Sequence, residues 1–126
     1  MQHHELVAWL GDDHDLTDDQ ITELLSTAAD IEDRYPDSDD EEERTAALTT
    51  AYRLLVEDSQ EVVDDLADAL ASARIAESEA LAAGRQAALM LVRVGDRTAR
   101  GIESQQGLAR ALGVDRKTVI DWLGRR

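Results

Sequence analysis

The residues that could do chemistry in this chain are mostly charged, and the two signs are separated along the sequence. Residues 1–84 contain four Arg, no Lys and 24 Asp or Glu, a net charge of −20, whereas residues 85–126 contain nine Lys or Arg and four acids, a net charge of +5. A basic segment can bind a polyanion, although the total charge of −15 would by itself argue against nucleic acid. A salt-adapted or high-GC proteome would explain the acidic part alone, so the basic end needs its own explanation.

Metal binding and acid–base catalysis are two further kinds of chemistry that these residue types could support. A metal site could be assembled on paper from His3, His4, Asp12, Asp13, His14 and Asp15. Their spacing fits no ligand pattern closely and terminal histidines are usually solvated, so we expect no metal. The acid pair Asp64 and Asp65 is expected to face water on a helix. Because the sequence has no glycine-rich phosphate loop, nucleophile elbow or triad-like arrangement, we expect neither an enzyme nor a cofactor.

The composition predicts an all-α protein made of one small domain or two mini-domains. Ala and Leu are abundant, while two Trp, two Tyr and no Phe supply little of the aromatic bulk that strands favour. The absence of cysteine excludes a disulfide framework and a thiolate site, and favours a cytoplasmic location. The longest apolar run, residues 87–92, is far short of the ~20 residues that span a bilayer. The first residues lack the features of a signal peptide, so we expect no membrane segment.

Capping patterns predict a helical hairpin in the acidic half. Thr17 can cap a helix over about residues 18–35, and Pro36 ends that helix. Ser38 repeats the capping pattern and opens a second helix that runs to about Glu57. The expected inward residues of the two helices are Ile21, Leu24, Leu25, Ala28 and Ile31, and then Leu48, Ala51, Tyr52, Leu55 and Val56.

Two details of the acidic half complete this prediction. A short helix over residues 4–10 is expected to precede the hairpin, with Leu6, Val7 and Leu10 on one side. The acidic run 39–43 could be a disordered tail, but its capping residues favour a solvated first turn of the second helix.

A long helix with a heptad pattern follows Ser59. Its apolar positions alternate in steps of four and three, and this heptad seam comprises Val62, Leu66, Ala69, Ala73, Ala76, Ala80, Ala83, Ala87, Met90 and Val94. A seam of alanines lets two helix backbones approach closely, so it favours pairing either with the preceding hairpin or with a second copy of the chain. Gly84 is a point where the helix could bend. We place the domain boundary near residue 80, giving regions 1–80 and 81–126.

The last residues predict two short helices joined by a tight turn. Ser104 is a suitable N-cap, and Gly113 can adopt the left-handed conformation that ends the first short helix. Asp115 can cap the next helix. The expected inward residues are Leu108, Ala109 and Leu112 on the first helix, Val114 in the turn, and Val119, Trp122 and Leu123 on the second.

Some positions of this stretch accept only a few residue types. They hold Gln105, Ala109, Gly113, Val114, Val119 and Trp122. With that combination, residues 105–123 resemble the helix-turn-helix of bacterial and phage repressors. The resemblance covers about 20 residues, or about 45 if a helix over residues 81–94 serves as the first of three. The segment 95–104 is longer than the usual first turn, and no further helix follows Arg126, so a minimal three-helix module is expected.

The resemblance implies that the helix over residues 115–123 enters the DNA major groove. It implies base-edge or phosphate contacts for Arg116, Lys117, Thr118 and Asp121. It implies phosphate contacts for Gln105 and Gln106 at the start of the supporting helix. A sequence-independent electrostatic attraction would come from Arg110, Arg125 and Arg126, with Arg97 and Arg100 from the preceding segment.

These expectations lead to a sequence-specific DNA-binding protein, a transcriptional regulator that forms a homodimer and acts in the cytoplasm at the nucleoid. A two-fold dimer would read two half-sites one helical turn apart. Two alternatives stay open. The acidic helices could bind a basic protein partner or mimic DNA towards it, with the C-terminal module as a docking unit. In the absence of DNA binding, that module would be a small three-helix packing unit whose basic face is solvated or docks onto the acidic half. The protein could also be a DNA-packaging or plasmid-maintenance factor.

Overall fold

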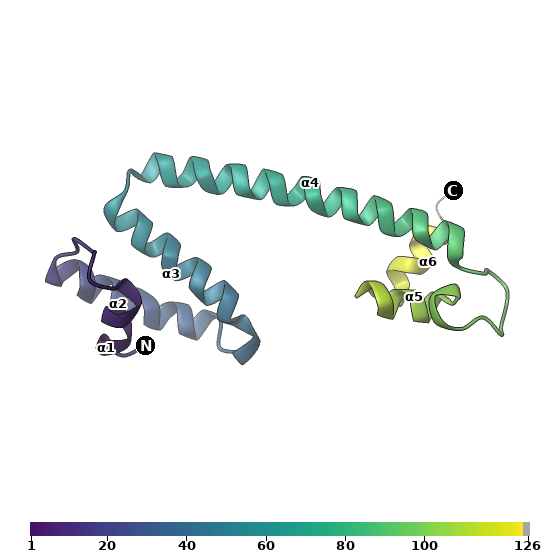
Figure 1. Ribbon diagram of the computed structural model, residues 1–126, viewed down its shortest axis with the longest axis horizontal. Coiled ribbons are helices and arrows are strands. Elements are labelled where there is room, and N and C mark those ends of the chain that lie inside the picture. Colours follow the sequence, from purple (N-terminus) through teal and green to yellow (C-terminus); the bar gives the residue numbers. More distant parts are fainter. Residues whose placement is uncertain (125–126) are drawn as a thin grey trace. The chain divides into compact units, whose positions relative to one another are not determined.

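The computed structural model of the chain describes residues 1–124, and these residues form helices and turns without a strand (Figure 1). The predicted all-α fold is therefore confirmed. The chain divides into two compact units, Met1–Asp68 and Ala69–Arg126, and the division falls inside helix α4 (Ser59–Leu91). Each unit has an apolar core of its own.

Three helices build the first unit ahead of α4. They are α1 (His3–Leu10), α2 (Asp18–Arg34) and α3 (Glu41–Val56), with a 3-10 turn η1 (Ser38–Asp40) between the last two. The helices α2 and α3 pack against each other, as the hairpin pattern predicts. The buried core residues are Leu6, Leu16, Leu24, Ala28, Ile31 and Leu48.

Local hydrogen bonds set the limits of α2 and of η1. The N–H of Gln20 donates to Thr17 Oγ1 (3.2 Å), and the N–H of Thr17 donates to Gln20 Oε1 (2.9 Å), so the predicted capping box is present. The helix ends before Pro36, as predicted. The second cap differs from the prediction, because Asp37 rather than Ser38 is the N-cap of η1. Asp caps a helix as well as Ser does, and Asp37 has the extended backbone that an N-cap requires.

Two arginines of α3 fix the connections on either side of this helix. Arg44 Nη1 donates to the carbonyl oxygens of Tyr35 (2.7 Å) and Asp37 (2.6 Å), which lie at the end of α2 and just beyond it. Arg53 bonds Glu57 (Nε to Oε2, 2.8 Å) and Asp65 of α4 (Nη2 to Oδ2, 2.6 Å). The hydrogen bonds from Arg53 lower the pKa of Glu57 from its ordinary value.

Two residues expected inside the first unit lie at its surface. Val7 and Val56 are both exposed, although their neighbours Leu6 and Leu55 contribute to the core. Val56 is the last residue of α3, where the chain is already leaving the hairpin. Helix α1 is short and presents only a narrow edge to the core, so Leu6 is fully buried while Val7 is left outside.

The second unit contains the later part of α4, a 3-10 turn η2 (Gly101–Glu103), α5 (Gln105–Leu112) and α6 (Arg116–Gly124). Helix α4 ends at Leu91, before the predicted limit at Val94. The part of α4 between residues 63 and 83 is exposed throughout. The buried core residues are Ala88, Val92, Leu108, Ala109 and Val119, with Val114, Trp122 and Leu123 packed against them.

The C-terminal end of the heptad seam does not form the packing face within the second unit, and its last residue, Val94, lies beyond the end of α4. Met90 and Val94 are 74% and 67% exposed, whereas Ala88 and Val92 are buried. The short helices pack on the face of α4 that carries Gly84, Ala88 and Val92, which are spaced by four residues. The small residues on this face admit a large neighbouring side chain, and the packing face is therefore rotated away from the seam.

Candidate nucleic-acid interface

Helix α5 begins and ends at the two residues that the sequence singled out. The N–H of Gly107 donates to Ser104 Oγ (3.0 Å), and this hydroxyl donates in turn to the carbonyl of Gly101 (2.9 Å). Gly113 ends the helix with φ 71° and ψ 31°, a left-handed conformation that glycine adopts without a Cβ penalty. The chain therefore turns at Gly113 and starts a second helix instead of continuing as one rod.

Helix α6 has one buried and one exposed side. Val119 is fully buried, and Trp122 and Leu123 are partly buried against the same core. On the other side, Arg116, Lys117, Ile120 and Asp121 are exposed, while Thr118 is half-buried. At the start of α6, the carbonyl of Asp115 accepts hydrogen bonds from the N–H groups of Thr118 (3.0 Å) and Val119 (3.4 Å).

Two glycines allow close approach between the elements of this unit. A Cβ at Gly84 of α4 would lie 3.1 Å from Cη2 of Trp122, so the absence of a side chain there leaves room for the indole. A Cβ at Gly107 of α5 would lie 1.8 Å from the carbonyl oxygen of Gly101 in η2. The second contact is between backbones, so η2 can lie against α5 only because position 107 is glycine. This requirement was not predicted from the sequence, where the available signal is a glycine in the first turn of a helix.

The structure brings some of the predicted residues together around a polar depression. Arg116 Nη2 lies 3.5 Å from Gln105 Oε1, which joins the start of α6 to the start of α5. The depression has a volume of about 580 Å³, and its arginine and glutamine side chains can donate hydrogen bonds to an anion: Arg93, Arg97, Gln105, Gln106 and Arg116. Four of these five residues are predicted from the sequence. Arg93, a cation just beyond the end of α4, is not, although its position could have indicated it.

Hydrogen bonds within the segment before η2 shape one wall of this depression. Asp96 Oδ1 accepts from the N–H (2.8 Å) and the hydroxyl (2.7 Å) of Thr98. These two bonds lower the pKa of Asp96 from its ordinary value. Arg93 pairs with Glu103 (Nη2 to Oε1, 3.2 Å) and more distantly with Asp96 (3.9 Å), so much of its charge is already compensated. Among the cations of the depression, Arg97 and Arg116 are therefore the better candidates for an external anion.

The remaining predicted residues lie apart from the depression. Lys117 and Asp121 project from α6, and Arg110 is exposed on α5. Arg125 and Arg126 lie outside the described residues.

Other kinds of site receive no support within the described part of the chain. None of the helices formed by residues 1–124 is both long and apolar enough to cross a membrane. Over the same residues, no group of three or more His, Asp or Glu side chains is arranged to hold a metal ion. His14 has a local structural contact, since its Nδ1 accepts a hydrogen bond from the N–H of Leu16 (3.2 Å).

Comparison of the chain with protein-family models, with curated proteins and with solved structures finds no match in any of the three.

Proposed function

We propose that residues 104–123 form a helix-turn-helix that binds double-stranded DNA, and that the protein is a dimeric, sequence-specific transcriptional regulator. The observation that carries this proposal is the division of α6 into two sides. Val119 and Trp122 hold the helix on the core, which leaves Arg116 and Lys117 exposed at its first turn. The first turn is where the resemblance to repressors implies contact with base edges.

The charge around α6 supports the same proposal. Neither Arg116 nor Lys117 forms an ion pair with a carboxylate of residues 1–124. The hydrogen bond of Arg116 is a long one (3.5 Å) to the neutral amide of Gln105, so the charge of Arg116 remains available to an anion. Gln105 and Gln106 lie beside it at the start of α5, where N–H groups and amide side chains favour a phosphate.

Binding to genomic DNA fragments at two salt concentrations tests this proposal. For the wild type, we expect affinity to fall steeply between about 50 mM and 200 mM salt, because bound phosphates release counterions. The double variant Arg116→Ala, Lys117→Ala should bind at least about tenfold more weakly and with a shallower salt dependence. The matched control Arg34→Ala, Arg74→Ala removes the same charge from the acidic helices and should change affinity less than about twofold.

Two results would contradict the proposal in different ways. Equal affinity of wild type and the α6 variant would remove α6 as the recognition helix. DNA binding without salt dependence, or no binding at either concentration, would remove DNA as the ligand.

For the dimer, we propose that α4 pairs with α4 of a second copy along the heptad seam. The support is that residues 63–83 are exposed, although Leu66 and the seam alanines give that part of α4 an apolar stripe. The variant Ala73→Lys, Ala80→Lys places two charges on the seam and should yield a monomer in sedimentation equilibrium. Ala71→Lys, Ala82→Lys places the same charges about half a turn away and should leave the dimer intact. A wild-type monomer, or equal effects of the two pairs, would contradict the proposed interface.

A further inference from the structure

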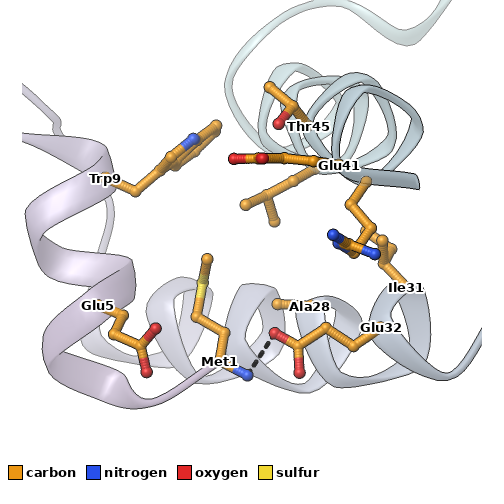
Figure 2. Close-up of a pocket in the computed structure, with 10 residues that line it drawn as sticks. Met1, Glu5, Trp9, Ala28, Ile31, Glu32, Glu41 and Thr45 are labelled. Atoms are coloured by element: carbon orange, nitrogen blue, oxygen red, sulfur yellow. Dashed lines mark ion pairs between the residues drawn. The ribbon is translucent and has the colours of Figure 1, made fainter. Parts of the chain in front are cut away.

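The first unit contains a pocket that the proposed DNA-binding function does not use. Figure 2 shows it between α1, α2 and α3, with the side chain of Trp9 facing Glu41 across the opening. Its volume is about 320 Å³, which is within the range of small-ligand sites. Buried apolar residues form its floor: Ala28, Ile31 and Leu48.

Carboxylates from all three helices lie around this apolar floor. Glu5 comes from α1, Glu32 from α2 and Glu41 from α3, and all three are exposed. Glu41 forms no ion pair with any group of residues 1–124. The only cationic side chain among the lining residues is Arg44, whose guanidinium already donates to two backbone carbonyls. With three carboxylates against the guanidinium of Arg44 and the amino group of Met1, the lining residues keep a net charge of −1.

The chain's own N-terminus illustrates the chemistry that this pocket accepts. The amino group of Met1 pairs with Glu32 Oε1 at 2.5 Å, while the Met1 side chain lines the pocket (Figure 2). An ammonium group thus pairs with one of these carboxylates while the apolar side chain of the same residue contacts the cavity. Glu41 lies on the other side of the opening and is left for a second cation.

Trp9 adds a surface that favours a planar cation. Its indole packs edge-on against Tyr52, with ring centroids 6.2 Å apart and an interplanar angle of 80°, and it remains partly exposed to the pocket. A guanidinium can stack on an indole and form a bidentate pair with a carboxylate, whereas an ammonium interacts with the ring and the carboxylate as a point charge, without stacking or a bidentate geometry.

We propose that this pocket binds an arginine side chain of a basic protein partner, with the aliphatic stem on the apolar floor and the guanidinium between Trp9 and Glu41. The net charge of −20 on residues 1–84 favours a basic partner over an acidic or neutral one. This proposal does not depend on DNA binding, because it uses no residue of the second unit.

Peptide binding to the full-length chain tests the proposal. The probe is an acetylated and amidated peptide of alternating Arg and Ser, and the control peptide has citrulline, a neutral isostere, at every Arg. We expect the arginine peptide to bind at low salt and to shift the indole resonance of Trp9. Glu41→Gln should weaken binding about fivefold or more, since it removes a charge-assisted pair. Trp9→Leu should weaken binding by a similar factor without any change in charge.

Glu42→Gln is the matched control, because Glu42 is the next residue on α3, is exposed and does not line this pocket. It should weaken binding less than about twofold. Equal weakening by Glu41→Gln and Glu42→Gln would show a diffuse attraction between charges and would overturn the proposal. Equal binding of the arginine and citrulline peptides, or no binding of either, would overturn it as well. Circular dichroism of each variant checks that the helices are retained, and Arg116→Ala, Lys117→Ala should leave peptide affinity unchanged even if DNA binding is lost.

Discussion

The two units of this protein are both helical, yet they bury different kinds of side chain. In Met1–Asp68, large residues such as Leu6, Leu24 and Leu48 fill the space between helices. In Ala69–Arg126, glycine and alanine take many of the contact positions, and backbones lie close together at Gly107. The first kind of core is sensitive to the removal of atoms and the second to their addition.

The units also differ in whether their arginine and lysine side chains have partners within the chain. In the first unit, Arg44 and Arg53 are both engaged by oxygens of the chain itself, and the excess carboxylates are solvated or line a pocket. In the second unit, Arg116 and Lys117 are exposed without a carboxylate partner from the described residues. The overall charge of −15 therefore describes neither unit, and partners have to be inferred for each unit separately.

The largest effect that tests this comparison is expected from a truncation in the first core. Leu24→Ala should destabilise that unit by about 3 kcal/mol, because it removes a fully buried side chain and leaves a cavity. Chemical denaturation followed at the indole resonance of Trp9 measures the loss, and that of Trp122 should change little. Leu54→Ala, at an exposed position of α3, should cost less than about 0.5 kcal/mol. Similar losses for the two variants would show that the core is not where the structure places it.

An added methyl group in the second unit should have the next largest effect. Gly107→Ala would bring Cβ within 1.8 Å of the Gly101 carbonyl, so η2 must move away from α5 at a cost of about 2 kcal/mol. Here the Trp122 resonance should report the destabilisation while the Trp9 resonance is unaffected. Gly124→Ala also adds a methyl group, but nothing lies within 4 Å of that position, and it should be neutral or slightly stabilising. If Gly107→Ala behaves like Gly124→Ala, the close backbone contact is wrong.

The loss of a helix cap should destabilise either unit less than the two core substitutions do. Thr17→Ala and Ser104→Ala each remove a side-chain acceptor from a first-turn N–H, with an expected loss of about 1 kcal/mol in the unit concerned. The hydroxyl of Ser104 also holds the Gly101 carbonyl, so Ser104→Ala should be the more damaging of the two. Hydrogen exchange at the amides of Gln20 and Gly107 follows the two caps separately. A larger loss of stability for Thr17→Ala than for Ser104→Ala would contradict this second role of the Ser104 hydroxyl.

The smallest effect concerns pH. The pKa of Glu57 is lowered by Arg53, and the pKa of Asp96 is lowered by Thr98. A folded-state pKa below the unfolded value stabilises the fold fully above the ordinary pKa and loses that contribution as pH falls through the lowered value. Each unit should therefore become slightly less stable on acidification, between about pH 5 and pH 2. Carboxyl NMR titration should place both midpoints below those of exposed acids, and Glu57→Gln or Asp96→Asn should remove the effect from one unit only. Unshifted midpoints would contradict the contacts of Arg53 and Thr98.

Features that depend on a few neighbouring residues were predictable from the sequence. The Thr17 cap, the helix end at Pro36 and the turn at Gly113 each follow from the chemistry of one or two side chains, and all three are confirmed. The same holds for the exposed side of α6, which follows from helical periodicity around Val119. The DNA contacts of these exposed residues stay a prediction.

Features that depend on a tertiary partner were not predictable in the same way. The heptad pattern does not identify the packing face within the second unit, because the short helices use the face of Ala88 and Val92 rather than that of Met90. Periodicity shows that a helix has an apolar stripe and does not show which part of it the neighbours will cover. The pocket beside Trp9 was missed for the same reason, since it lies between helices that are separate in the sequence. The contact between Gly107 and Gly101 is local in the sequence, and it depends on how closely η2 folds back onto α5.

The contact of Arg44 with the end of α2 has a consequence for how this protein can vary in evolution. Its acceptors are main-chain oxygens, which every residue type supplies, so replacements at Tyr35 or Asp37 leave both acceptors in place. Position 44 accepts fewer residue types, because few side chains carry several donors on a stem long enough to reach two carbonyls. Replacements at positions 35 and 37 should therefore leave the acceptors of Arg44 in place, whereas most replacements at position 44 should remove both bonds.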